Sequence, residues 1–72
     1  MDWGHLESRW GQMTAQICVY WGRLKEGEVK VSRGNRERFT NLLRSRYDIP
    51  REEAERQIKT FLEQYTFYEK QY

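Results

Sequence analysis

Apolar side chains recur at helical spacing near the start of the chain. At about 100° per residue, six of them fall within an arc of about 80° on one helix: Leu6, Trp10, Met13, Ile17, Trp21 and Leu24. A stripe of this width is typical of a helix that buries one face. Gly22 and the polar residues after it predict the end of that helix.

The last third of the chain carries the clearest helical pattern. Its apolar positions recur every three or four residues: Ala54, Ile58, Phe61, Tyr65, Tyr68 and Tyr72, with Leu62 at the edge of the stripe. Pro50 and two acidic residues after it suit the first turn of a helix. The pattern therefore predicts a long amphipathic helix that begins near Pro50.

Two shorter helices are predicted between these segments. The run EGEVKVSR has only two apolar residues, Val29 and Val31, and their β-branching lowers its helix propensity. Gly34 then breaks the chain, and Asn35 is a good N-cap for a third helix ending near Tyr47. The apolar arc of that helix contains Phe39, Leu42, Leu43 and Tyr47.

These segments predict an all-α fold, because no stretch alternates for long and no hairpin turn is present. We expect residues 1–72 to form a single domain, a small bundle of four short helices of which the second is short. The predicted core is Leu6, Trp10, Met13, Ile17, Trp21, Leu24, Phe39, Leu42, Leu43, Tyr47, Ala54, Ile58, Phe61, Leu62 and Tyr65.

Composition excludes several classes of protein. The longest apolar run, 17–21, is too short to cross a membrane, and the acidic start does not resemble a secretory leader. We therefore expect a cytoplasmic protein. One cysteine, Cys18, and one histidine, His5, cannot supply an internal disulfide or a zinc site. No cofactor or metal is expected.

Charge is concentrated in the middle of the chain. Residues 23–46 contain eight basic and three acidic residues, although the net charge of the whole chain is only +2. Four arginines there are candidates for contacts with phosphates or nucleic acid: Arg33, Arg36, Arg38 and Arg44. Glu37 and the acidic last helix offer internal partners, so a solvated or internally paired face is the favoured interpretation.

Three apolar residues lie off the predicted stripes and are candidates for an interface, including one between two copies of the chain: Trp3, Val19 and Phe67.

No arrangement in the sequence indicates catalysis. His5 has no neighbouring acid, serine or cysteine that would form a recognisable catalytic group, and Glu52 and Glu53 belong to a helix start. We therefore expect a protein that is not an enzyme.

Several motifs resemble the CsbD-like family of small bacterial stress-response proteins, over roughly residues 10–61. Trp10 is followed eleven positions later by the run WGRL at 21–24, and then come GNRE at 34–37, RY at 46–47 and EEAE at 52–55 with Gln57. Asp48 replaces the glycine usual in that family, and Pro50 replaces a residue that is often polar. The stretch 14–20 is also more apolar than is usual there.

This resemblance implies a small helical protein associated with general stress, and it implies no catalytic activity. The sequence therefore favours a non-enzymatic, soluble stress-response protein that acts by binding or by its abundance, with a partner that the sequence does not identify. Two alternatives stay open: weak nucleic-acid binding through the arginine-rich middle, and an interaction module that forms a homodimer.

Overall fold

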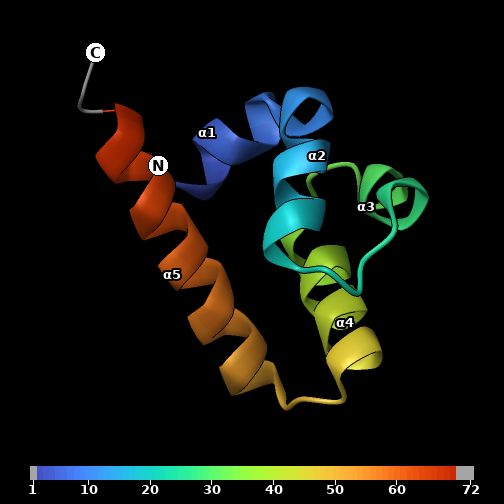
Figure 1. Cartoon of the computed structure of the whole chain (residues 1–72). Helices are drawn as coiled ribbons and strands as arrows, with labels where there is room; N and C mark the ends of the chain where they lie inside the picture. Colours follow the sequence, from blue (N-terminus) through green and yellow to red (C-terminus); the bar gives the residue numbers. More distant parts are fainter. Residues whose placement is uncertain (1, 70–72) are drawn as a thin grey trace.

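The computed structural model describes residues 2–69, with side chains described for residues 2–64. Within that range the chain forms five helices and no strand: α1 (Trp3–Ser8), α2 (Trp10–Tyr20), α3 (Glu26–Ser32), α4 (Arg36–Tyr47) and α5 (Arg51–Glu69). In Figure 1, α5 forms one side of the molecule and α2, α3 and α4 form the other. The prediction of an all-α fold is confirmed.

The first predicted helix is divided in two at Arg9. This residue leaves helical geometry, with φ −114° and ψ 20°, and its N–H donates to the carbonyls of Leu6 and Glu7. Both Leu6 and Trp10 are nevertheless buried. A bend that keeps the apolar residues on the inner side leaves the periodicity intact, so the pattern predicted one helix where the structure has α1 and α2.

The end of α2 also lies earlier than the apolar stripe suggests. The last helical residue is Tyr20, and Trp21 caps the helix by donating its N–H to the carbonyl of Ile17 at 2.8 Å. Trp21 and Leu24 are both buried, yet they belong to the connection between α2 and α3. A tight turn at Leu24, whose N–H donates to the carbonyl of Trp21, keeps both side chains pointing inward.

The boundaries of α3 and α4 agree with their turn residues. Asn35 accepts the N–H of Arg38 at 3.0 Å, which is the N-cap bond expected from its side chain. Asp48 ends α4 with φ 52°, in the left-handed region that aspartate tolerates better than most residues. The segment EGEVKVS is helical despite its two valines, because α3 packs against both α2 and α4.

The buried core draws side chains from all five helices and from the connection after α2. Its members are Leu6, Trp10, Met13, Ile17, Trp21, Leu24, Val29, Phe39, Leu43, Ala54, Ile58, Phe61 and Leu62. Within it, Phe39 lies between the indoles of Trp10 and Trp21, with ring centroids 5.4 and 5.3 Å away. Val29 was left out of the predicted core and lies fully buried.

Each of the three indole N–H groups donates to a different part of the chain. Trp3 donates to the carbonyl of Gly34 at 2.9 Å, and Trp10 donates to the carbonyl of Val29 at 2.8 Å. Trp21 donates to the side-chain oxygen of Gln57 at 2.9 Å. These bonds satisfy the polar atoms of the indoles and tie the first third of the chain to α3, to the α3–α4 turn and to α5.

Trp3, named above as a candidate interface residue, is half-buried and packs against the core. Its ring lies 5.6 Å from that of Trp10 and 6.0 Å from that of Phe39, and the guanidinium of Arg36 covers it at 5.6 Å. The bend at Arg9 brings α1 into position for these contacts. The apolar surface of Trp3 is therefore largely used within the chain.

Two residues of the predicted core are only half-buried. Leu42 and Tyr47 pack against the rim of the core. The hydroxyl of Tyr47 accepts the backbone N–H of Arg23 at 3.0 Å, so the ring stays at the surface where its polar end finds a partner. The side chains of Tyr65 and Phe67 lie outside the described residues.

A chain of polar contacts runs from the buried Trp21 to the surface of α5. Gln57, which accepts from the indole of Trp21, donates its own N–H to Glu53 at 2.9 Å. Glu53 also accepts from Arg56 at 2.9 Å. These bonds, chiefly that from Arg56 and then that from Gln57, hold the pKa of the Glu53 carboxyl below its ordinary value.

We expect part of the acid sensitivity of the fold to arise at Glu53. Its pKa is lower in the folded chain than in the unfolded chain, where it is near 4.5. Its contribution to stability is thus fully present above that value and is lost as the pH falls through the folded pKa. Urea unfolding at a series of pH values below 5 should therefore show a shallower loss of stability for Glu53→Gln than for the parent. Parallel curves would contradict this assignment.

Candidate binding groove between α3 and α4

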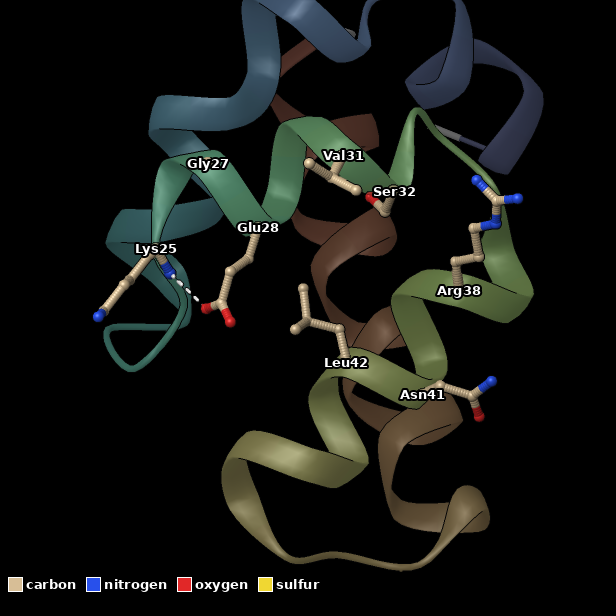
Figure 2. A pocket seen from close by; sticks show the side chains of 8 residues that line it. All are labelled: Lys25, Gly27, Glu28, Val31, Ser32, Arg38, Asn41 and Leu42. Atoms are coloured by element: carbon tan, nitrogen blue, oxygen red, sulfur yellow. Dashed lines mark hydrogen bonds between the residues drawn. The ribbon is translucent and has the colours of Figure 1, made fainter.

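An open groove of about 720 Å³ lies between α3 and α4. Its lining comes from the start and last turn of α3 and from one side of α4: Lys25, Gly27, Glu28, Val31, Ser32, Arg38, Asn41 and Leu42. Figure 2 shows Leu42 reaching from α4 toward α3, where Val31 lies, with Arg38 near one end of the groove and Lys25 near the other. We treat this groove as the candidate site.

The floor of the groove is apolar. Val31 is 71% exposed, while Val29, two residues earlier, is fully buried. Residues two positions apart on a helix differ by about 200° in direction, so Val31 must face outward when Val29 enters the core. Leu42 is half-buried beside the core, and Gly27 adds no side chain. The apolar side chains of Val31 and Leu42 therefore face the open space of the groove.

The rim of the groove is basic. Glu28 accepts hydrogen bonds from the backbone N–H of Lys25 at 3.3 Å and from Nε of Arg46 at 3.1 Å, and it forms an ion pair with the same guanidinium. Its charge is thus matched by Arg46. Among the side chains that the structure describes, Lys25 and Arg38 form no ion pair. The lining therefore contains two cations that have no carboxylate partner among the described side chains.

The two helices that line the groove are anchored on the side that faces the core. Val29 and Phe39 anchor α3 and α4 in the core, and the indole of Trp10 donates to the carbonyl of Val29. Arg46 and Glu28 join the two helices near the Lys25 end of the groove. Both walls of the groove are therefore anchored in the core, and one ion pair joins them.

The four arginines suggested for phosphate contacts are all exposed but do not share a face. Arg33 ends α3 with φ 52°, and the other three lie on α4. At about 100° per residue, Arg38 is about 160° from Arg36 and about 120° from Arg44 around that helix. Arg36 lies over the ring of Trp3, and Arg38 lines the groove. This arrangement does not form one phosphate-binding surface.

Val19 is 81% exposed in the last turn of α2 and is not among the residues that line the groove. It remains a candidate for an interface. Cys18, next to it, is half-buried, and burial, followed by the nearby charge of Glu26, raises the pKa of its thiol. A raised pKa disfavours the reactive thiolate.

The described part of the chain also bears on two other classes of function, metal binding and membrane spanning. Among the side chains of residues 2–64, no group of three or more histidine, cysteine, aspartate or glutamate residues could hold a metal ion. Over residues 2–69, no helix combines the length and apolar character needed to cross a bilayer.

Sequence reasoning did not find the groove. The available signals were Gly27 near the start of a short helix and Val31 on the opposite side of that helix from Val29. Neither signal identifies a groove by itself, because the second wall belongs to α4 and becomes visible only when the two helices are packed together. Arg38 was named as an anion contact, but its neighbours in the groove were not.

Several bacterial proteins are similar to this chain. A UPF0337 protein of Nitrosomonas europaea is 34% identical over 61 residues, which are 85% of this chain and 65% of that protein. A UPF0337 protein of Bordetella pertussis is 33% identical over 55 residues, 76% of this chain and 83% of the relative. A UPF0337 protein of Pseudomonas aeruginosa is 29% identical over 56 residues, 78% of this chain and 86% of that protein. No family model and no solved structure matches the chain significantly.

Proposed function

The chain belongs to the UPF0337 family of bacterial proteins, and from this premise we propose that it is a soluble, cytoplasmic stress-response protein that binds a partner in the α3–α4 groove and catalyses no reaction. The role in stress is supported by the motifs shared with CsbD-like proteins, which span Trp10, the WGRL run and the EEAE run. The relatives' names state no activity, so the mode of action is argued from the groove.

One observation carries the binding role: an apolar floor, with Val31 71% exposed, lies inside an open groove of about 720 Å³. Single exposed apolar residues are common on protein surfaces, but a concave apolar site with a few polar groups at its rim is the usual form of a binding site. Filling this groove would remove Val31 and Leu42 from water, which is favourable by about 25 cal/mol per Å² of apolar surface.

Replacing Val31 by aspartate should weaken binding of a neutral apolar probe without unfolding the protein. Nile red titrated into the protein should bind at least about five-fold more weakly to Val31→Asp, because the variant loses apolar contact and places a charge that needs water in the groove. The melting temperature should change little, since the side chain is exposed.

Val19→Asp is a closely matched control. Val19 and Val31 are both exposed valines, and each is the next-to-last residue of its helix, so the two substitutions change charge and helix stability alike. Val19→Asp should leave the affinity for Nile red unchanged. Equal weakening by the two variants, or weakening by neither, would overturn the groove as the binding site.

A further inference from the structure

We propose that the α3–α4 groove binds a single-chain fatty acid in solution, with its carboxylate on Arg38 and its hydrocarbon chain over Val31 and Leu42. This inference rests on the binding role proposed above and assigns the class of ligand. It is built on three features of the groove: the two cations at its rim, the bare backbone at Gly27, and its size.

The cations select a ligand with a negative head group. Because Arg46 matches Glu28, Arg38 is the cation left for a ligand at its end of the groove, while the Lys25 side chain at the other end points outward in Figure 2. A guanidinium offers donors in a planar fork that fits the two oxygens of a carboxylate. In Figure 2, Arg38 stands near one end of the groove, which leaves the remaining length for the apolar part of the ligand.

Gly27 keeps the opposite end of the groove open. An added Cβ at this position would meet no atom within 4 Å, so packing does not require a glycine here. Glycine is also less favourable in a helix than alanine. The residue therefore lowers the stability of a seven-residue helix while leaving room beside Val31 for a flexible chain.

The size of the groove suits a small amphiphile better than a folded partner. Its volume of about 720 Å³ lies within the range of about 300–1,000 Å³ that is usual for small-molecule sites. A stable protein interface buries about 800 Å² on each partner, which a groove walled on one side by a seven-residue helix does not supply alone. A symmetric pairing of two grooves would also bring the same cations together.

The test is a titration of the full chain with sodium decanoate below its micelle concentration, followed by calorimetry and by backbone amide shifts. The largest shifts should fall on α3 and on the α4 residues near Leu42. Hexanoate and octanoate should bind progressively more weakly, by about two- to four-fold for each methylene removed. Arg38→Gln should weaken decanoate about five-fold. Arg44→Gln, an exposed arginine of α4 outside the groove, should have no effect.

Gly27→Leu supplies a second variant that does not depend on charge. The new side chain meets no existing atom near its Cβ, so the variant should fold at least as stably as the parent while filling the groove. Decanoate should then lose at least about ten-fold in affinity. Gly22→Leu, at an exposed glycine with equal space around it, should bind decanoate like the parent.

The outcomes separate this inference from the proposed function. If decyl maltoside, a neutral amphiphile, binds as tightly as decanoate and Arg38→Gln changes neither, the groove binds apolar ligands but the carboxylate assignment is overturned. If neither amphiphile nor Nile red binds, the proposed function fails as well. If Gly27→Leu instead converts a dimeric parent into a monomer in sedimentation, a second copy occupies the groove and the fatty-acid inference is wrong.

Discussion

Trp21→Ala should leave the protein largely unfolded at room temperature. Trp21 is only 3% exposed, and its ring contacts those of Phe39 and Phe61 at 5.3 and 5.0 Å. Removing a buried tryptophan side chain costs about 3–5 kcal/mol. A domain of 72 residues has little more stability than that to lose. Helical circular dichroism and a urea titration would measure the effect.

Trp21→Phe separates the packing of the ring from its hydrogen bond. Phenylalanine keeps most of the aromatic contact but cannot donate to Gln57, so we expect a smaller loss of about 1–2 kcal/mol. Val19→Ala, at an exposed position, should change the unfolding midpoint very little. An alanine variant of Trp21 that melts like the parent would show that the core does not depend on this ring.

Gly34→Ala should be the most damaging of the single methyl additions at glycine. Gly34 has φ +77°, where an L side chain costs about 1–2 kcal/mol. A Cβ there would also lie 2.8 Å from Cγ of Glu7 and 3.3 Å from its Cα. Overpacking of this kind adds about 1–3 kcal/mol, so the total expected loss is about 2–5 kcal/mol in the free energy of unfolding.

A double variant tests which part of this cost is steric. Glu7→Ala removes the Cγ that the new methyl group would strike, but it leaves the Cα and the positive φ unchanged. Glu7→Ala should therefore recover part of the loss caused by Gly34→Ala, but not all of it. Gly11→Ala, inside α2 with open space around it, should stabilise the protein by up to about 1 kcal/mol. Full recovery in the double variant would mean that backbone strain contributes nothing.

Much of the fold follows from side-chain periodicity. Residues such as Ile17, Phe39 and Ile58 are buried because a stripe repeating every three or four positions can leave water only by meeting another stripe. Helix caps can also be predicted from the sequence, because the N-cap bond of Asn35 and the left-handed φ of Asp48 depend on the type of residue at each position. These features are local or depend on spacing alone.

The features that the sequence did not reveal depend on how distant segments meet. The bend at Arg9 does not occur at a glycine or proline, so the sequence gives no local signal for it. It is held by the packing of Trp3 against Phe39 and by the hydrogen bond from the Trp3 indole to Gly34. The groove is of the same kind. Val31 and Leu42 are eleven residues apart and face one site only because α3 and α4 pack together.

The placement of the three indoles has an optical consequence. Each ring sits at a separate junction, one against the α3–α4 turn, one against α3 and one against α5. Because the rings of Trp3 and Trp10 lie 5.6 Å apart, fluorescence from the intact molecule mixes the signals of these junctions. Proteins that retain a single tryptophan in turn, with phenylalanine at the other two positions, would resolve the order in which these junctions open, with no attached dye.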